Sequence, residues 1–538
     1  MNRIMLAAVS AALAAVMCAC APLDAARTNI NELMGKTNGG AEEAQETQTG
    51  TETMNNESAF VQPNTINIGV VDIDTWNPLL TQSPTVREAM ELVYDTLYEV
   101  NSRHEAVPVL AKDYSLSPDG KTVVVNLKPD VLWHDGGRFD AYDVVYTVNL
   151  IMGGSTAYGN LLSNVASCER AGTSSVRFTL HRSVPDFPAT LTFPIIKYKT
   201  SMEYNANIVP VGTGPFKFHG KMSTDKYLLV KYDNYHNGPA DIEAVNIIEI
   251  PDWDKYRLMF AASEIDLATD SMFDIINGMP NRNISVKSYT TDKMTYIGYN
   301  LASPVFSGAP TRRGISMLID RDDIVSSILY SKAKPVNIPI NPSSYLYYDT
   351  SVEFGTDYEE AYDEFEKDGW EPQTQGFSRK NGTQSLSVRL LVNSDDEIKI
   401  KTAEKIKETL TRFGVEAVLD KQPSEAYQAK LNAQDFEMFI GEIDVSGNND
   451  LRPLTDEWNY FSYASPDVNT IISQVGMTVD VYERQQLFIQ LCERLKTDMP
   501  FAPLYFADGC VMSGSKIKTG IEPTVSSDYR VANLWRTK

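Results

Sequence analysis

The chain has 538 residues, of which 43% are apolar and 22% are charged. Lys and Arg number 48 and Asp and Glu number 71, which gives a formal net charge of −23. This length corresponds to about three domains, and the composition excludes both a globally disordered chain and a polytopic membrane protein. The acidic balance, without any run rich in Lys and Arg, argues against nucleic acid as a partner because that affinity depends on basic contacts to phosphate.

The N-terminus has the pattern of a bacterial export signal. Arg3 provides a positive charge, and the uncharged, mostly apolar stretch Ile4–Ala19 follows it. This stretch is shorter than the roughly twenty residues that a membrane-spanning helix needs, so residues 1–19 are predicted to be a signal peptide. The end of the stretch resembles a lipobox, which predicts lipidation of Cys20 as the mature N-terminus. Lipidation of Cys18 and an ordinary signal peptide are the alternatives.

Residues 20–64 differ in composition from the rest of the chain. They are rich in Gly, Thr, Glu, Gln and Asn and contain few large apolar residues. Such a segment cannot bury enough apolar surface to offset the entropy lost on ordering, so it is predicted to be a disordered tether. Removal of the leader takes away the positive charge of Arg3 and leaves a net charge of −24. The sequence therefore predicts a protein that is lipid-anchored to the outer face of the bacterial cell membrane.

Three further cysteines follow the lipidation candidates: Cys168, Cys492 and Cys510. An odd number cannot all pair, and the chain contains neither a CxxC motif nor a Cys/His cluster. The sequence indicates neither a disulfide framework nor a zinc site. It leaves open either a single Cys492–Cys510 disulfide or three buried free thiols.

The first half of the folded part is predicted to be rich in strands. Hydrophobic periodicity and turn residues predict the following elements: a strand at Ile66–Val71, a helix at Val86–Leu97, strands at Lys121–Leu127 and Arg177–Leu180, and a helix from Ala141 through Ile151. Together they indicate an α/β protein.

A clearer unit occurs in the second half. It comprises a strand at Leu386–Val392, a helix at Ile400–Phe413, a strand at Val415–Leu419, a helix through Ala426 and Leu431, and a strand at Phe436–Ile440. Alternating strands and helices predict a parallel sheet with right-handed crossovers. Because ligands bind beyond the carboxyl ends of such strands, the polar residues 441–450 are predicted to face a binding site.

Reactive motifs are missing from the sequence. Five histidines occur without an HxH or HExxH pattern, and no GxSxG motif, P-loop or GxGxxG fingerprint is found. The Gly212–Phe216 stretch lacks the Gly-Lys-Ser/Thr of a phosphate loop. We therefore expect no catalytic residue, no metal and no cofactor. An exported hydrolase with scattered catalytic residues is the alternative.

Several motifs occur in the order in which they occur in one family. They are Pro108–Ala111, Ser117–Lys121, Leu127–Gly136, Phe139–Tyr146, Gly212–Phe216, Tyr299–Pro304, Arg312–Arg321, Tyr463–Asp467 and Tyr482–Tyr505. These segments resemble the signature of the family 5 extracellular solute-binding proteins, which are peptide- and nickel-binding lipoproteins of ABC importers. The resemblance extends from about Ile66 to the C-terminus.

The resemblance implies a periplasmic-binding-protein type II fold, in which two lobes joined by a hinge enclose the ligand and an additional domain is present. The implied boundaries are residues 65–98, 200–298 and 508–538 for a discontinuous first lobe, 99–199 for the additional domain and 299–507 for the second lobe. The chain is expected to cross between the lobes near Tyr299 and near Leu504.

The resemblance and the strand-end rule together select candidate ligand-binding residues. These are Trp76, Asn77, Thr213, Gly214, Asn300, Glu442, Asp444, Asn449 and Asp450. In peptide-binding members of the family, a carboxylate in a motif of the W-x-x-D-Y-x-D-P kind holds the ammonium group of the ligand. The corresponding residues 441–450 lack the Trp and the Asp-Pro, which places a standard oligopeptide ligand in doubt. Either Asp444 or Asp450 is expected to take this role, and a solvated loop acid is the alternative.

Other candidates also have structural alternatives. Trp76 either lines the cleft or holds its loop against the core. Thr213 and Gly214 either lie at the edge of the cleft or form a structural turn.

The resemblance implies a non-catalytic receptor that captures peptides or peptide-like solutes and delivers them to an ABC permease. A monomer is expected, with the membrane reached through the lipid anchor alone. The alternatives are a different solute in the same fold, such as a chelated metal, a sensory receptor, and the hydrolase named above.

Overall fold

The computed structural model describes residues 64–154, 156–198, 209–271, 284–348, 355–373, 378–445, 447–456 and 459–537. The predicted signal peptide, the predicted tether up to residue 63, and both candidate lipidation cysteines lie outside these residues. We keep the name additional domain for residues 99–199 and the name second lobe for residues 299–507.

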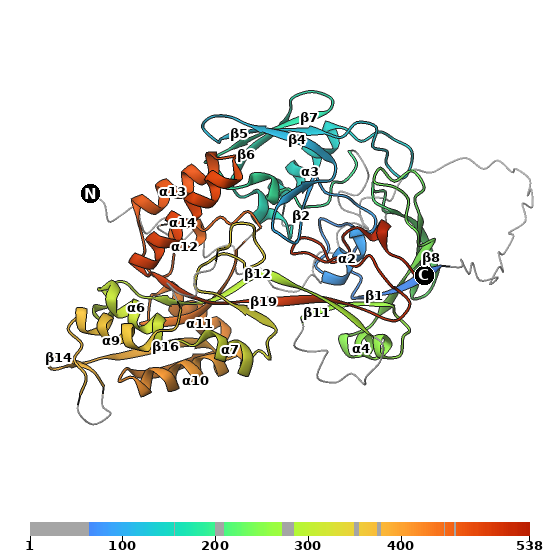
Figure 1. Ribbon diagram of the computed structural model, residues 1–538. Coiled ribbons are helices and arrows are strands. Elements are labelled where there is room, and N and C mark those ends of the chain that lie inside the picture. The colour runs from blue at the N-terminus through green and yellow to red at the C-terminus, as the bar shows by residue number, and fades with distance from the viewer. Residues whose placement is uncertain are drawn as a thin grey trace, which may run out of the picture. The chain divides into compact units, whose positions relative to one another are not determined.

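Short strands dominate the part of the chain up to β11 (Figure 1). The elements in chain order are β1 (Thr65–Val71), α2 (Pro84–Glu91), β2 (Tyr98–Val100), β3 (Ala106–Pro108), β4 (Ala111–Leu116), β5 (Thr122–Leu127), α3 (Ala141–Gly153), η1 (Gly159–Leu162), β6 (Val165–Arg170), β7 (Ser175–Leu180), η2 (Phe187–Thr190), β8 (Phe216–Ser223), β9 (Lys226–Lys231), β10 (Ala244–Ile250), α4 (Trp253–Ala261) and β11 (Leu267–Ser271).

Longer helices and strands follow. They are β12 (Ser285–Tyr299), η4 (Pro304–Phe306), α6 (Ala309–Leu318), α7 (Arg321–Ser327), β13 (Ala333–Pro335), α9 (Tyr358–Lys367), β14 (Lys380–Asn381), β15 (Gln384–Ser385), β16 (Ser387–Asn393), α10 (Glu397–Arg412), β17 (Glu416–Gln422), α11 (Ser424–Asn432), β18 (Met438–Asp444), α12 (Arg452–Thr455), α13 (Pro466–Met477), α14 (Val481–Asp498), β19 (Phe501–Ser513) and η5 (Ala532–Leu534).

One eleven-stranded sheet has the order β17-β16-β18-β12-β19-β11-β1-β10-β9-β8, and β13 pairs with β19 beside this path. β16 pairs in parallel with both β17 and β18, and α10 and α11 form the connections. The predicted strand–helix–strand–helix–strand unit is therefore confirmed. A separate four-stranded sheet, in the order β4-β5-β7-β6, lies within the additional domain.

The predicted helix at Val86–Leu97 is too long. α2 ends at Glu91, although Val93 and Leu97 are buried beyond its end. The chain leaves the helix because the carbonyl oxygens of Leu92 and Val93 accept hydrogen bonds from backbone N–H groups of Phe216 and Gly214. A tertiary contact thus replaces the next helical turn.

The predicted strand at Phe436–Ile440 is too short at its end. β18 continues to Asp444 because residues 438–444 pair antiparallel with Lys293–Tyr299 of β12. Residues 441–444 therefore belong to a strand, and the connection that faces the binding site begins after Asp444.

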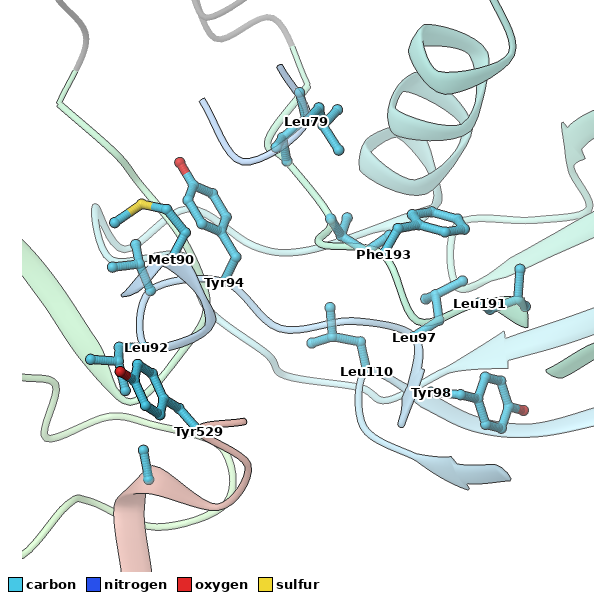
Figure 2. Packing of buried hydrophobic residues seen from close by; sticks show 14 of the residues in the cluster. Leu79, Met90, Leu92, Tyr94, Leu97, Tyr98, Leu110, Leu191, Phe193 and Tyr529 are labelled. Atoms are coloured by element: carbon cyan, nitrogen blue, oxygen red, sulfur yellow. The ribbon is translucent and has the colours of Figure 1, made fainter. Parts of the chain in front are cut away.

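The buried apolar side chains divide into clusters that share no residue. One cluster joins residues 66–267 and 511–535, which include the additional domain, and a smaller one adds residues of 71–268, Cys510 and Met512. Figure 2 shows Leu110 and Phe193 of the additional domain packed in the same cluster as Met90 and Tyr529. Two other clusters consist only of residues between Met294 and Phe506. The additional domain therefore shares a core with the first lobe, and the second lobe has cores of its own.

The chain between Gly212 and Phe216 lies very close to the loop that follows α2. A Cβ atom placed on Gly212 would lie 1.7 Å from the carbonyl oxygen of Val93, and one on Gly214 would lie 2.8 Å from the Val93 carbonyl carbon. Both contacts are with backbone, which cannot move aside as a flexible side chain can. Only glycine fits at these two positions.

We predict that Gly212→Ala lowers the free energy of unfolding by about 3 kcal/mol, because the added methyl group overlaps the Val93 backbone. Gly153→Ala, at the last residue of α3, is the matched control because no atom lies within 4 Å of its Cβ position. We expect the control to stay within about 0.5 kcal/mol of the parent protein. Urea denaturation followed by circular dichroism measures both, and equal stabilities would contradict the prediction.

Candidate functional site

Two cavities meet at Asp444, the last residue of β18. The larger has a volume of about 770 Å³ and lies between the additional domain and the second lobe. The smaller has a volume of about 480 Å³ and lies beside β12 and β19. Asp444 is the residue that lines both, so the two spaces form one candidate binding site. We call them the outer cavity and the hinge-side cavity.

Uncharged side chains form much of the outer cavity. Its lining includes Asn160, Leu161, Ser163, Asn164, Val184, Phe187, Thr190, Ile443, Asn448, Pro453 and Asn459, with charged residues Arg182, Asp444, Asp450, Arg452 and Asp456. The mixture of apolar groups with amides and hydroxyls suits a ligand that is partly apolar and has hydrogen-bonding groups.

Acidic side chains dominate the hinge-side cavity. Its charged lining consists of Glu88, Asp292, Lys293, Asp444, Asp508 and Asp528. Burial, together with the negative charge of Asp444, raises the pKa of Asp292 well above its usual range. The nearby His104 is buried, and burial lowers its pKa to about 4. Its Nδ1 lies 3.4 Å from a carboxyl oxygen of Asp292. Burial thus favours the neutral forms of both groups.

The carboxylate of Asp444 is free to bind a ligand. Asp444 is exposed to the cleft, and within the described part of the chain its side chain makes no hydrogen bond and no ion pair. Burial by surrounding atoms raises its pKa, while the charge of Lys293, its partner in the β12 register, opposes that shift. Nothing else in the described structure competes for its oxygens.

Asp450, the other candidate ammonium ligand, is already engaged. Its Oδ1 accepts hydrogen bonds from Nε of Arg452 at 2.7 Å and from the backbone N–H of Arg452 at 3.1 Å. A ligand ammonium would have to compete with this guanidinium. The geometry therefore favours Asp444 over Asp450, the two alternatives that the sequence leaves open.

Val525 and Asp528, near the C-terminus, line one wall of the hinge-side cavity. Buried carboxyl groups form hydrogen bonds that hold this segment in place. Glu91 of α2 accepts hydrogen bonds from the hydroxyl of Ser527 at 2.7 Å and the backbone N–H of Tyr529 at 2.9 Å. Asp528 accepts one from the hydroxyl of Tyr289 at 3.0 Å. Burial, followed by the charge of Asp528, raises the pKa of Glu91 to about 8. Burial also raises the pKa of Asp528 to about 6.

The first two predicted site residues lie outside both cavities. Trp76 is buried, with its ring centroid 5.5 Å from that of Phe218 and 4.9 Å from that of Tyr227. Asn77 is buried, and its Oδ1 accepts a hydrogen bond from the N–H of Leu79. These contacts fit the alternative in which Trp76 holds its loop against the core.

The next two predicted residues form a turn. The hydroxyl of Thr213 donates to Asp95 at 2.9 Å, and Thr213 is buried, while Gly214 packs on the Val93 backbone. Neither lines either cavity. This arrangement fits the structural turn that the sequence leaves open.

The remaining three predicted residues are also apart from the cavities. Nδ2 of Asn300 donates to the carbonyl oxygens of Gln434 and Phe436, which fixes the start of β18. Glu442 lies 3.2 Å from Nζ of Lys399 and lines neither cavity. Asn449 is buried with φ of +54°. Of the nine predicted positions, the structure places Asp444 and Asp450 at the cleft.

The structure also bears on the cysteines, on possible metal ligands and on membrane-spanning helices. Cys168, Cys492 and Cys510 are buried and are not disulfide-bonded to one another, so no Cys492–Cys510 disulfide forms in the structure. Among the described residues, no group of three or more His, Cys, Asp or Glu is arranged to hold a metal ion. Every helix within the described ranges is too short or too polar to cross a bilayer.

The family model for bacterial extracellular solute-binding proteins, family 5 (middle), matches residues 105–462. The chain belongs to this family. The match covers most of the folded part, so the predicted family resemblance is confirmed.

Curated relatives of this family 5 protein bind different solutes. The oligopeptide-binding protein AppA of Bacillus subtilis is 22% identical over 80% of this chain and 84% of its own length. The nickel-binding periplasmic protein of Escherichia coli is 21% identical over 82% and 89%. The solute-binding role is therefore shared, while the names of the relatives differ in what is bound.

Solved structures agree on the fold. The nickel ABC transporter protein of Bacillus halodurans superposes with a TM-score of 0.74 at 21% identity, over 88% of this chain and 99% of its own. AppA of B. subtilis in complex with a nonapeptide gives 0.61 at 20% identity, over 88% and 99%. The predicted two-lobed type II fold of periplasmic binding proteins is confirmed.

Several cleft residues of this family 5 protein escaped sequence reasoning. Asp292 and Asp508 stand within long strands, and an acid inside an otherwise strand-forming run is a signal that could have identified them. Arg182 and Glu88 carry no such signal, because only the tertiary fold brings them to the cavities.

We predict that the stability of the protein falls as pH rises from about 4.5 to 8, in part because of Glu91. The folded state holds the Glu91 proton to a higher pH than the unfolded state does. Each rise in pH within this range therefore lowers the free energy of the unfolded state relative to that of the folded state. This group alone changes the free energy of unfolding by up to about 1.4 kcal/mol per pH unit in that range. Glu91→Gln is expected to flatten the profile.

Urea denaturation between pH 5 and pH 9 measures this effect. Glu416→Gln, at an exposed strand position, is the matched control and should retain the slope of the parent protein. A Glu91→Gln profile as steep as that of the parent would show that Glu91 does not hold the proton.

Proposed function

We propose that this family 5 protein is the extracytoplasmic receptor of an ABC importer and captures peptides or peptide-like solutes between its lobes. Ligand contacts made only in the closed state would favour closure of the hinge. The protein would then deliver the solute to the permease. The observation that supports this proposal most directly is the unengaged carboxylate of Asp444 at the junction of the two cavities.

A carboxylate in this position is suited to an ammonium group. It is accessible within the cleft, has no hydrogen-bonding partner among the described residues, and stands at the end of a strand that two cavities adjoin. An amino-terminal ammonium is a charged donor, and charged hydrogen bonds are about twice as strong as neutral ones. The ligand would extend from Asp444 into the outer cavity.

The lining of the outer cavity supports a permissive peptide site. The amide of Asn160 and the hydroxyl of Ser163 can meet backbone groups directly or through water. Apolar groups such as Leu161 and Phe187 offer contact to side chains without a fixed hydrogen-bonding pattern. Such a lining recognises a peptide-like backbone more than a particular side chain.

The charge of the cleft disfavours anionic ligands. Acidic residues outnumber basic ones in the two linings, and both arginines of the outer cavity already have carboxylate partners, Asp450 for Arg452 and Asp456 for Arg182. A ligand carboxylate in the outer cavity would therefore have to displace one of these pairs. Cationic and neutral peptides are expected to bind better than acidic ones.

A second candidate solute is a chelated metal. Nickel-binding relatives of this chain favour it. No histidine lines either cavity, so a bare metal ion would lack imidazole ligands in these linings. A chelate, which carries its own metal ligands, would avoid that requirement.

Native mass spectrometry of protein purified from bacterial membranes tests the proposal. We expect a retained mass that fragments as a peptide and a polypeptide that begins at a lipidated Cys20. A retained metal chelate would support the second candidate and contradict the first. A mature mass without lipid, or one that begins at Cys18, would contradict the anchor at Cys20. Turnover of an added peptide library would indicate a hydrolase.

We predict that Asp444→Asn weakens binding of a peptide with a free amino terminus by about tenfold or more, which corresponds to about 1.4 kcal/mol. Calorimetry with the peptide recovered from the native protein measures the dissociation constant. Glu442→Gln is the matched control, because Glu442 is an acid two residues away that pairs with Lys399. The N-acetylated form of the same peptide should bind both variants equally. An unchanged dissociation constant for Asp444→Asn would contradict the role of Asp444.

A further inference from the structure

Polar contacts join the additional domain to the second lobe along the edge of the outer cavity. Nη1 of Arg182 lies 2.7 Å from a carboxylate oxygen of Asp456. Nη2 of Arg452 donates to the carbonyl oxygen of Ser183 at 2.8 Å. Arg182, Arg452 and Asp456 also line the cavity, so this contact forms part of its wall. We call the contact the seam.

The guanidinium of Arg452 is the most enclosed group of the seam. Only 5% of Arg452 is exposed, and its charge is balanced by Asp450 on its own side of the seam. Its bond to the Ser183 carbonyl reaches the other side. When the seam separates, that carbonyl and the guanidinium each lose a partner and must regain one from water. A charged hydrogen bond of this kind is stronger than a neutral one.

A second ion pair crosses the seam farther along. Asp186 of the additional domain lies 3.6 Å from Nη1 of Arg484, and both side chains are nearly buried. The same guanidinium donates to the hydroxyl of Tyr345 at 2.6 Å, and the N–H of Tyr345 donates to the carbonyl oxygen of Arg103 at 2.8 Å. The second lobe thus contacts the additional domain at two loops, around Arg103 and around Asp186.

Small residues allow the two sides to approach closely. A Cβ on Gly476 of α13 would lie 2.9 Å from the carbonyl carbon of Ser183, and one on Gly120 would lie 3.0 Å from the carbonyl oxygen of Gly476. The hydroxyl of Ser183 donates to the carbonyl oxygen of Ser473 at 3.2 Å. The seam is a fitted interface and not an incidental approach of two surfaces.

The seam joins two bodies that share no apolar core. Residues of the additional domain belong to the cluster of the first lobe, while the clusters of the second lobe hold only residues between Met294 and Phe506. β12 and β19 contribute to the sheet on both sides. Since the seam consists of hydrogen bonds and ion pairs, the two bodies can separate there without exposing a hydrophobic core.

We propose that the seam is a latch, in which contacts between the two bodies hold the cleft closed whether or not a ligand is bound. All of its bonds are made between protein groups, so their contribution to closure is the same for every ligand that leaves these bonds intact. The latch rests on the proposed function only in that closure serves ligand capture. Its strength sets the fraction of protein in the closed state and thus scales the affinity for all such ligands by one factor.

Fluorescence energy transfer between dyes on the two bodies tests the latch in ligand-free protein. Dyes can be placed at Lys112→Cys of β4 and Glu416→Cys of β17, both exposed positions, because the three cysteines among the described residues are buried and the proposed lipidation blocks the thiol of Cys20. We expect a dominant high-transfer population in the parent protein. Arg452→Gln should shift it toward low transfer. An unshifted distribution, or a parent protein that is mainly in the low-transfer state without peptide, would overturn the proposal.

Two further variants separate the latch from a general loss of folding. Arg182→Asp places a second acid opposite Asp456 and should open the cleft, and adding Asp456→Arg should restore the high-transfer population. Arg412→Gln removes an exposed ion pair within α10, which does not cross the seam, and should leave the distribution unchanged. Failure of the reversed pair to restore closure would overturn the assignment of this contact.

Binding of a pentapeptide library at a fixed concentration gives a second measurement. Arg452→Gln should lower the bound amounts of neutral and cationic peptides by the same factor, about tenfold if the closed fraction falls to a tenth. Unequal losses would mean that Arg452 contacts the peptides, which contradicts a latch. If no peptide binds the parent protein while the transfer distributions shift as expected, the latch stands and the proposed function fails.

Discussion

β12 and β19 pair antiparallel, with one register shift between Thr290 and Met294, which we call the bulge, and another between Thr295 and Tyr296. On one side of the bulge, β19 residues from Cys510 onward pack into the cores of the first lobe. On the other side, residues up to Phe506 pack into those of the second lobe. The two strands therefore change cores within a few residues of each other. The hinge-side cavity and its acidic lining lie at this change, and Asp444, the register partner of Lys293, connects them to the outer cavity.

The change of core explains why acids occur inside two long strands. Asp292 lies in the bulge of β12 and Asp508 lies beside it in β19, where neither lobe covers the strands with apolar side chains. The hydroxyls of Thr290 and Thr291 bond to Asp508 and to the Ala507 carbonyl across the gap. A polar lining at this place keeps the two cores separate and leaves room for a solute. The same polarity would keep the free-energy cost of the proposed hinge motion low, because no large apolar surface would be exposed when the lobes part.

Sequence patterns predicted the fold well where secondary structure is local. The unit from β16 to β18 follows from its alternating apolar strands and amphipathic helices, and Gly414, with φ of +80°, ends α10 as expected. Prediction failed where a distant segment competes with a local element. α2 stops because Gly214 and Phe216 bond to the residues that would extend it, and β18 continues because β12 supplies a partner.

The site was harder to predict than the fold, for a related reason. Asp444, which lines both cavities, could be selected from the sequence because the end of a strand in a parallel unit is a local signal, and its role in binding stays a prediction. Trp76 and Thr213 have the residue types of a binding site, yet their side chains are used by Phe218, Tyr227 and Asp95 in the interior. Residue type alone does not distinguish these two uses, since both require an aromatic or hydroxyl group at a loop. The two uses differ in whether another residue of the folded protein already packs against the side chain or forms a hydrogen bond with it.

Whether a side chain already has a partner within the protein also distinguishes residues suited to ligand recognition from residues suited to closure of the cleft. Asp444 has no protein partner among the described residues, so the energy it would contribute in the proposed site depends on the ligand and would discriminate between solutes. Arg452 and Arg484 have protein partners on both sides of the seam, so the energy they would contribute to the proposed latch is the same for every ligand that leaves these contacts intact. A receptor for varied peptides benefits from this division. A weakly discriminating cleft gives little binding energy per contact. If the interface favours closure by itself, less of that binding energy is needed to close the lobes.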